Sequence, residues 1–327
     1  MIAPRVTVAV ATYNRAHLVS RAIASVRAQS IQEIQVIVVD DGSTDDTPGV
    51  LARIDDPRLG IIRHDTNRGI SHARNTAIAA ATGEWIAFLD DDNEWLPDYL
   101  ERQLGLAASH PRADVVYCRA RRLDDRTKRE MLVPYRMAEG EVFDDLVSGW
   151  IPLMSCSLFR RATLVELGGL DEALTASEDR DLFMRLAQRA AFAATPDVLV
   201  TRHEHSGTQL SRNYEKLQRD ADVLDLKWKA VIVAGCGWIA YRRWRAMLVA
   251  LAEMAAALRA VEGGRRLDGV RSLGRMARHL PWSFPAVARG AVLTAFGLRA
   301  YGRAGLAWSS IRANLLGTAR ARPYHRS

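Results

Sequence analysis

The first hundred residues alternate short runs of β-branched residues with helical patterns, and this rhythm limits the possible folds more than any other feature. The runs follow one another as strand-like Val6–Ala11, helical Leu18–Gln29, strand-like Ile34–Val39 and strand-like Leu59–His64. Strands that alternate with helical stretches are typical of βαβ units, whose strands run parallel. The sequence therefore predicts an α/β fold with a mostly parallel central sheet and helices on both faces.

The same rhythm continues to about residue 118. A helical Ile70–Ala81, a buried-type strand at Trp85–Leu89 and a helix that begins near Pro97 extend the doubly wound pattern. Residues 119–150 are rich in charge and show no clean period of 2 or 3.6. We expect a loop-rich insertion there.

Strand and helix signals return after residue 150. Met154–Phe159 is strand-like, and Ser177 is a candidate N-cap for a helix that runs to about Arg189. From Leu226 onward the pattern is almost entirely helical, with Ala, Leu and Arg dominant. We predict an α/β domain at 1–225, with halves at 1–118 and 119–225, and a helical extension at 226–327.

Charge is divided unevenly between these parts. Residues 226–327 hold 18 Lys and Arg against 3 Asp and Glu, and the rest holds 27 against 35, although the whole chain is only +7. The extension also carries five of the eight tryptophans, at Trp228, Trp238, Trp244, Trp282 and Trp308. Such a segment suits the surface of an anionic membrane, and a helical bundle with a solvated basic face explains it equally well. No nucleic-acid-binding signature is visible, so we expect no nucleic acid partner.

Cysteine content and apolar runs indicate the compartment. Three widely spaced cysteines make neither a disulfide framework nor a C-x-x-C metal site. The N-terminus lacks the pattern of a secretory signal. The longest uncharged apolar-rich run, Ala230–Tyr241, has 12 residues, whereas a spanning helix needs about 20. We expect a cytoplasmic protein, either free or peripheral on the inner face of the membrane.

Three acidic residues, Asp90, Asp91 and Asp92, directly follow the apolar run that ends at Leu89. Ligands of open α/β sheets gather at the carboxyl ends of strands. In extended backbone Asp90 and Asp92 project to the same side, so both carboxylates can face one hard divalent cation, Mn²⁺ or Mg²⁺. A solvated acidic turn is the alternative for this segment taken alone.

Two further strand ends carry polar residues that suit a nucleotide. Asp40 and Asp41 follow Ile34–Val39 and could accept hydrogen bonds from a base or a ribose, although an Asp-Gly turn is the simpler explanation. An aromatic face for stacking and a guanidinium for phosphate follow the first strand, in the run Thr12-Tyr13-Asn14-Arg15. Neighbouring strand ends of a parallel sheet line one crevice, which favours a single site over three unrelated turns.

An ordered set of motifs carries a resemblance to a known family. The motifs read Val6-x-Val-x-Val-Ala-Thr-Tyr-Asn-Arg, then Val38-Val39-Asp40-Asp41-Gly42-Ser43-Thr44-Asp45, then Asn67-Arg68-Gly69 with Ala73-Arg74-Asn75, then Phe88-Leu89-Asp90-Asp91-Asp92-x-x-Trp95-Leu96-Pro97, and later Gly168-Gly169-Leu170-Asp171-Glu172 and Glu178-Asp179-x-Asp181-Leu182. Over roughly residues 5–211 the chain resembles family 2 of the inverting nucleotide-sugar glycosyltransferases. The resemblance implies the GT-A fold, a divalent cation, and transfer of a sugar from a nucleotide-diphosphate sugar to an acceptor hydroxyl.

The resemblance also implies roles for individual residues. Asp90-Asp91-Asp92 matches the family's D-x-D metal motif, with Asp92 the surest cation ligand and Asp90 or Asp91 in contact with ribose or metal. The family's nucleobase and diphosphate positions correspond to Thr12, Tyr13, Asp40 or Asp41, and Arg74, and we add Asn14 and Arg15 from the first motif. Asp179 matches the catalytic base that takes the acceptor's proton. A helix-capping acid beside Ser177 is the structural alternative for Asp179.

His203 and His205 lie where family members often carry a histidine at the metal or phosphate. We take His205 as the candidate metal ligand and leave His203 open; exposed loop histidines are an equal alternative. The Q-x-x-R-W motif of the family's processive members is missing, because Ala240 stands in the glutamine position before Arg243-Trp244. The resemblance therefore favours non-processive transfer to a glycan or lipid-linked acceptor.

Other function classes fit less well. A sugar nucleotidyltransferase would be expected to carry a glycine-rich basic loop after the first strand, and a Rossmann oxidoreductase would carry G-x-G-x-x-G there. This chain has Ala11-Thr12-Tyr13-Asn14-Arg15 instead. A catalytically inactive relative that only binds glycans or partners stays open, although intact Asp92 and Asp179 argue against it.

Overall fold

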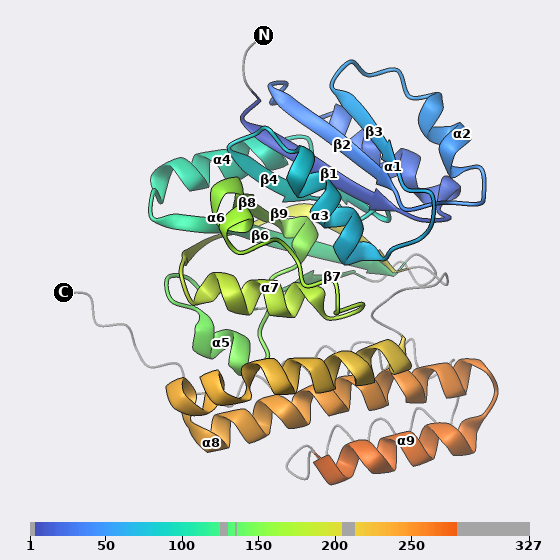
Figure 1. Ribbon diagram of the computed structural model, residues 1–327, viewed down its shortest axis with the longest axis vertical. Coiled ribbons are helices and arrows are strands. Elements are labelled where there is room, and N and C mark those ends of the chain that lie inside the picture. The colour runs from blue at the N-terminus through green and yellow to red at the C-terminus, as the bar shows by residue number, and fades with distance from the viewer. Residues whose placement is uncertain (1–3, 125–129, 135, 205–212, 280–327) are drawn as a thin grey trace. The chain divides into compact units, whose positions relative to one another are not determined.

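The computed structural model of the protein describes residues 4–124, 130–134, 136–204 and 213–279 (Figure 1). The chain forms two compact units. The first contains residues up to 146 and 151–207, and the second contains Val147–Trp150 and the chain from residue 208 onward. The boundary predicted at residue 225 falls inside a helix of the second unit.

Strands and helices alternate through the first two hundred residues. In chain order the described elements are β1 (Val6–Thr12), α1 (Ala16–Arg27), β2 (Ile34–Asp40), α2 (Thr47–Ala52), β3 (Leu59–Arg63), α3 (Ile70–Ala80), β4 (Trp85–Phe88), β5 (Asn93–Trp95), α4 (Tyr99–Ser109), β6 (Ala113–Asp124), β7 (Glu130–Val133), α5 (Phe143–Val147), the 3₁₀ turn η1 (Met154–Cys156), β8 (Ser157–Arg160), α6 (Arg161–Glu166), α7 (Glu178–Ala187) and β9 (Ala191–Glu204).

The strands form one sheet in the order β3-β2-β1-β4-β8-β6-β9-β5, with β7 paired to β6. The first four strands are parallel, as the alternation predicts, and β6 and β9 are parallel again. In contrast, β8 runs antiparallel to both neighbours, and β5 and β7 are antiparallel to their partners. The α/β architecture predicted from the sequence is confirmed, and the carboxyl ends of β1, β2 and β4 meet at one edge.

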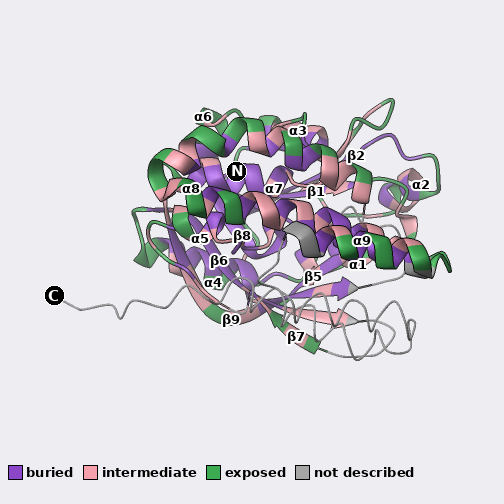
Figure 2. Ribbon diagram, turned by 90° about the horizontal axis from the view of Figure 1, so that it is seen from below, coloured by how far each residue is buried: buried purple, intermediate pink, exposed green. Residues whose placement is uncertain are grey.

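Helices cover both faces of this sheet. Val8 of β1 joins Ile23 of α1 and Leu104 of α4 in one buried cluster. Because successive strand residues point to opposite faces, α3, which contacts β1 and β2 without entering that cluster, covers the other face. On that face the rings of Phe88 and Phe159 pack edge to face with centroids 5.7 Å apart. Figure 2 shows β6 and β8 as largely buried and the outer sides of many helices as exposed.

The region that follows residue 118 differs from its prediction. The expectation of a loop-rich insertion at 119–150 holds only in part. β6 continues to Asp124 and is followed by β7 and α5, whereas residues 136–139 and 148–150 form no helix or strand. Residues Ala120–Leu123 of β6 pair with both β7 and β9, and the periodicity of one strand cannot reveal such pairing. The strand predicted at Met154–Phe159 begins at Ser157, after η1.

The second unit is helical. α8 (Tyr214–Glu262) is a hairpin of two helices, because Gly237 at its centre has a φ of 87° that no α-helical residue adopts. Arg259 lies 3.4 Å from Glu215, and the Tyr241 hydroxyl donates to Asp225 at 2.7 Å, so the two halves run antiparallel.

α9 (Arg266–His279) packs against the second half of α8, where Arg275 and Glu253 form an ion pair at 2.8 Å. Trp228 and Trp244 are buried in this unit, whereas Trp282 and Trp308 lie outside the described residues. Within the described chain, no helix is both long enough and apolar enough to cross a bilayer.

Candidate functional site

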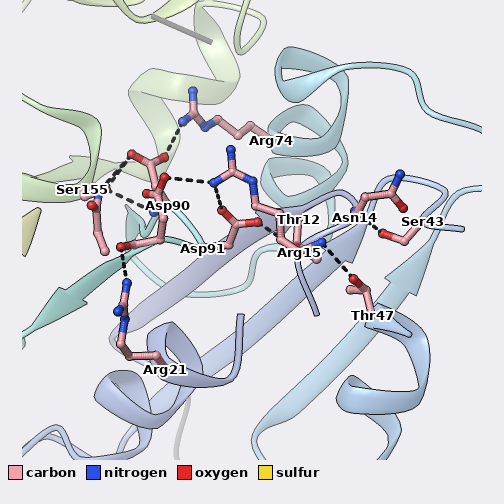
Figure 3. A network of polar contacts seen from close by, with 12 residues as sticks. Thr12, Asn14, Arg15, Arg21, Ser43, Thr47, Arg74, Asp90, Asp91 and Ser155 are labelled. Carbon is pink, nitrogen blue, oxygen red and sulfur yellow. Dashed lines mark hydrogen bonds and ion pairs between the residues drawn. The ribbon is translucent and has the colours of Figure 1, made fainter. Parts of the chain in front are cut away.

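The residues predicted at three strand ends lie next to one another. The last residue of β1, Thr12, is in register with the last residue of β2, Asp40. β4 pairs with β1 on its other side, and the Leu89 amide donates to the Ala9 carbonyl at 3.0 Å just before the three aspartates. Close approach of these ends follows from the parallel register, so the structure brings the three motifs to one edge (Figure 3).

Asp91 points into the protein and links two of these motifs. Its Oδ2 accepts a hydrogen bond from the Thr12 hydroxyl at 2.7 Å, and its Oδ1 lies 3.1 Å from Nη1 of Arg15. Burial raises the pKa of Asp91 to about 7, and the positive charge of Arg15 opposes that rise. Asp91 and Thr12, predicted as ligand contacts, therefore act first as internal partners that join β1 to the end of β4.

Arg15 also contacts Asp92, with Nη1 2.9 Å from Oδ2. One guanidinium thus contacts two carboxylates of the acidic motif. The backbone here is a turn, because the Asn93 amide donates to the Asp90 carbonyl at 3.0 Å. The argument that extended backbone puts Asp90 and Asp92 on one side is therefore wrong, since residues i and i+2 of a turn need not point the same way.

Asp90 is held by a polar cluster. Ser155 donates from its hydroxyl to Asp90 Oδ2 at 2.9 Å, and the same hydroxyl accepts from the Asp90 amide at 3.1 Å. Asn93 Nδ2 lies 3.2 Å from the same carboxylate oxygen. Ser155 precedes β8, and nothing in its local sequence suggested a place in the site. The Asp90 side chain is 39% exposed, so it still reaches solvent.

Arg74 of α3 connects the acidic motif to α7. Its Nη2 lies 2.8 Å from Asp90 Oδ1, and its Nη1 lies 2.7 Å from Glu178 Oε1. Burial disfavours the charge on Arg74, but the carboxylates of Asp90 and Glu178 raise its pKa above the ordinary value. Burial likewise raises the pKa of Glu178, and Arg74 limits the rise. The sequence analysis quoted Glu178 in a motif but gave it no role.

Asp179 follows Glu178 in the first turn of α7. Its carboxylate is half-buried and accepts a hydrogen bond from the Arg180 amide at 2.7 Å. Asp179 is close enough to raise the pKa of Arg74, together with Asp90 and Glu178. Ser177 occupies the N-cap position as predicted, but within the described chain its side chain makes no capping hydrogen bond. The candidate base therefore stands near the acidic motif, in the first turn of α7.

Asp41 accepts hydrogen bonds within the protein at both carboxylate oxygens. Its carboxylate accepts hydrogen bonds from the backbone amides of Arg68, at 3.0 and 3.1 Å, and Gly69, at 2.8 Å. Nδ1 of His64 lies 2.7 Å from the same group. Asp41 thus fixes the loop that leads into α3, where Gly69 has a φ of 94°.

Asp40 has one carboxylate oxygen that makes no hydrogen bond in the part of the chain that the structure describes. Its Oδ1 accepts from the Ser43 amide at 2.9 Å. Its buried Oδ2 makes no hydrogen bond within the described residues and has Arg63 at 3.4 Å as its ion-pair partner. Of the two aspartates that the sequence left as alternatives, Asp40 is the one with an acceptor available to a ligand.

Replacing Asp41 tests this assignment. Asp41→Ala is expected to lower the free energy of unfolding by about 3 kcal/mol, because hydrogen bonds from buried donors to a charged acceptor are lost together. Urea unfolding measures the change. The matched control is Asp65→Ala, an exposed carboxylate in the same loop region, which should change stability by less than about 0.5 kcal/mol. Equal stability of the two variants would refute the structural role.

The first motif supplies an exposed ring and a turn. Tyr13 is 42% exposed, so its face is available for stacking. Asn14 has a φ of 53°, and its side-chain oxygen accepts from the Thr44 amide at 2.7 Å. The Asn14 amide in turn donates to the Ser43 hydroxyl at 2.9 Å. Asn14, predicted among the ligand contacts, therefore ties the β1 loop to the β2 loop and leaves Tyr13 at the surface.

Of the two candidate histidines, His203 and His205, the structure describes only His203. His203 of β9 is buried, and its Nε2 lies 3.1 Å from Oε1 of Glu94. Glu94 pairs with Arg21 at 2.8 Å, and Arg21 donates to the backbone carbonyl of Asp92 at 3.0 Å. His203 is thus linked to the acidic turn through Glu94 and Arg21. His205, the predicted metal ligand, lies outside the described residues.

The donor set at the acidic motif suits a hard cation. Asp90 and Asp92 offer carboxylate oxygens, the ligand type that Mg²⁺ and Mn²⁺ prefer, and their side chains are 39% and 15% exposed. In the described part of the chain, no three His, Cys, Asp or Glu side chains gather as a complete metal site. The ligand type therefore fits a hard cation, and phosphate oxygens of a bound ligand would complete its coordination.

Comparison with known proteins agrees with the motifs. Residues 7–168 match the model of the family described as glycosyl transferase family 2. The resemblance inferred from the ordered motifs is therefore confirmed. A curated relative, the succinoglycan biosynthesis protein ExoO of Rhizobium meliloti, is 50% identical over 101 residues, which are 31% of this chain and 29% of that protein. The chain thus spans less than a third of this relative's length.

Solved structures share the fold. TarS of S. aureus in complex with UDP-GlcNAc aligns over 98% of this chain and 93% of that chain, with a TM-score of 0.60 and 19% identity. The mannosyltransferase PcManGT of Pyrobaculum calidifontis, in complex with GDP-Man and Mn²⁺, aligns over 98% and 87%, with a TM-score of 0.54 and 24% identity. These identities show a common GT-A-like fold and nothing more.

Proposed function

Because residues 7–168 belong to glycosyl transferase family 2, we propose that the protein transfers a sugar from a nucleotide-diphosphate sugar to an acceptor hydroxyl in glycan biosynthesis. The carrying observation is the Arg74 bridge, which holds Asp90 of the acidic motif and Glu178 at the start of α7 on one guanidinium. The bridge keeps Asp179 near the end of β4. A donor-binding carboxylate and a candidate base thus share one site.

The donor's nucleoside binds beside the ends of β1 and β2. The ring of Tyr13 offers a stacking face, and Asp40 Oδ2, which makes no hydrogen bond within the described residues, accepts from a base N–H or a ribose hydroxyl. Complexes of proteins with this fold contain UDP-GlcNAc in one case and GDP-Man with Mn²⁺ in another, which supports a nucleotide-sugar donor.

The diphosphate lies against the acidic turn. Asp92 and Asp90 would hold a divalent cation, which when bound offsets negative charge that develops on the leaving diphosphate. In the structure Arg15 pairs with Asp91 and Asp92. Its guanidinium is thus available to the diphosphate oxygens once the carboxylates have another cationic partner.

Asp179 serves as the base in a single, inverting displacement. The acceptor oxygen attacks the anomeric carbon as the bond to the diphosphate breaks, and the acceptor's proton passes to the Asp179 carboxylate. The N-terminus of α7 stabilises the carboxylate before the proton arrives. No carboxylic acid is needed for the leaving group, unlike in glycoside hydrolysis, because the diphosphate leaves as an anion.

A glycan or lipid-linked sugar is the proposed acceptor, and one sugar is added per encounter. Ala240 stands where the processive motif has glutamine, and Trp244 of the same segment is buried. Cys118, Cys156 and Cys236 are free thiols, which suits the cytoplasmic side of the membrane.

Thermal unfolding in the presence of UDP-, GDP- and dTDP-sugars, with and without Mn²⁺, tests the donor site. A donor at a hundredfold excess over Kd adds about 2.7 kcal/mol of stability and raises Tm by a few degrees. We expect one nucleotide class to give this shift, only with the cation, and Asp92→Ala to abolish it. Absence of a shift with every donor would overturn the proposal. A shift without sugar transfer or donor hydrolysis would instead identify an inactive relative that binds nucleotide-sugars.

A further inference from the structure

We propose that the tip of the α8 hairpin is a docking surface for an anionic lipid bilayer. The hairpin tip is defined here as residues 226–243, which flank the turn at Gly237. Lys229 Nζ lies 5.7 Å from the ring centroids of both Trp238 and Tyr241. The two helices therefore face each other at this end, and their exposed side chains form one local surface. The surface lies wholly within the helical unit.

Large apolar side chains are exposed at the hairpin tip. Leu226 is 87% exposed, Ile239 69% and Trp238 52%. Trp228 and Trp244 of the same two helices are almost completely buried, at 3% and 1% exposure. Leu267 and Val270 of α9 are also exposed, at 76% and 49%, so apolar exposure is not confined to the tip. What distinguishes the tip is that its apolar side chains include Trp238, whose ring lies beside Lys229.

Cations surround these apolar residues. Lys227, Lys229, Arg242 and Arg243 are all exposed. The one acidic residue between positions 223 and 252 is Asp225. Its carboxylate already accepts from Tyr241 at 2.7 Å and lies 3.4 Å from Arg245. Residues 226–243 therefore carry four cations and no Asp or Glu, and the exposed Asp222, one turn earlier, pairs with Arg245 at 2.6 Å.

This combination identifies the partner as a lipid surface. Aliphatic side chains can enter the acyl boundary while lysine and arginine reach the anionic headgroups, which is the arrangement of helices that lie in a membrane interface. A tryptophan beside a lysine, as at Trp238 and Lys229, suits the headgroup level, where an aromatic ring meets both water and lipid. An acidic protein partner would use the four cations but would leave Leu226 and Ile239 without an apolar counterpart.

Co-sedimentation with vesicles tests the proposal on the full-length chain. We expect binding to vesicles of phosphatidylcholine with phosphatidylglycerol, and little binding to phosphatidylcholine alone. Added salt should weaken the binding, because exposed charges are screened. Quenching of tryptophan fluorescence by brominated lipid should accompany binding and should fall in Trp238→Phe. Absence of binding to the anionic vesicles would overturn the proposal.

Matched variants show whether the tip itself carries the binding. Lys227→Gln with Arg243→Gln should weaken partition into anionic vesicles by about fivefold for each charge removed, and Ile239→Ser should weaken it further. The controls are Arg271→Gln and Leu267→Ser, exposed residues of α9 in the same unit, which should bind like the wild type.

Circular dichroism and Tm keep these results interpretable, because a variant that melts like the wild type has lost surface chemistry and not its fold. Equal weakening by the tip variants and the α9 variants would show attraction by general basic charge and would refute a specific tip. Light scattering that shows self-association of the wild type, abolished by Ile239→Ser, would show that a second copy covers the tip, and would refute the bilayer as partner. Sugar transfer to a soluble acceptor should be unchanged in every tip variant, so the proposed reaction is judged separately.

Discussion

Replacement of Asp179 by asparagine is expected to lower kcat by about 10²–10⁴-fold, the usual contribution of a general base. Asparagine keeps an oxygen that can accept from the Arg180 amide, so the start of α7 should be preserved. It cannot take a proton from the acceptor hydroxyl. Steady-state kinetics with the donor found by the thermal screen measures the change.

Two measurements separate this effect from a general loss of structure. Donor binding by Asp179→Asn, followed by the same thermal shift, should match the wild type, because the asparagine leaves Asp92 and Asp40 untouched. The control is Glu166→Gln, an exposed carboxylate at the end of α6, which should keep full activity. An Asp179→Asn enzyme with wild-type kcat would show that another group removes the proton.

Removal of the Arg74 guanidinium should have the largest effect on stability. Arg74→Ala leaves the carboxylates of Asp90 and Glu178 without their cation, and breaking one side of a buried ion pair costs about 3–5 kcal/mol. Urea unfolding measures the loss. The control is Arg53→Ala, whose partner Asp46 and own side chain are both about two-thirds exposed, and which should cost less than about 1 kcal/mol.

The destabilisation by Arg74→Ala should depend on pH. Burial already raises the pKa of Glu178 above its unfolded value, and loss of Arg74 raises that pKa further. For a carboxyl group whose pKa is higher in the folded than in the unfolded protein, the free energy of unfolding is greatest below the unfolded pKa of about 4.3. It falls as pH rises from there through the folded pKa, because the buried group must then lose its proton. The variant should therefore lose less stability at pH 5 than at pH 8.

A second substitution makes the stability result decisive. Glu178→Gln in the Arg74→Ala background removes one of the stranded charges and should recover part of the lost stability, with a weaker dependence on pH. Sugar transfer by the double variant should be low, because without Arg74 the link from Asp90 to α7 is lost. No recovery by Glu178→Gln would show that Arg74 does not act through the buried pair.

The parallel half of the sheet was predictable because its signals are local. β1, β2 and β4 are short apolar runs followed by turn residues, and burial on both faces requires such runs. The antiparallel strands were harder to predict. β6 carries several arginines and is a strand because β7, β8 and β9 pair with it, and β5 is only three residues long. Pairing partners distant in sequence decide such strands, and periodicity does not report them.

Within the site, residue types were predictable and their partners were not. Parallel register explains why Thr12, Asp40 and Asp90 meet, once the strands are known. The sequence offered Asp40 and Asp41 as equivalent, but hydrogen bonds from the loop at Arg68 and Gly69 occupy one and leave the other an acceptor. The aspartate that keeps an oxygen without a hydrogen bond in the described chain is decided by the loop at Arg68, more than twenty residues further along the chain, which donates to Asp41.

The amino-acid sequence by itself determined the α/β class, the position of the acidic motif at a strand end and the basic character of the helical extension, because periodicity, turn residues and charge are properties of short segments. Only the tertiary structure decided that Arg74 bridges Asp90 to Glu178, which lies 104 residues after Arg74 in the chain. It also decided that α8 is a hairpin that turns at Gly237 and exposes apolar side chains at its tip. Contacts of this kind depend on how the completed sheet and helices pack. Burial and charge compensation fix them after the local elements have formed.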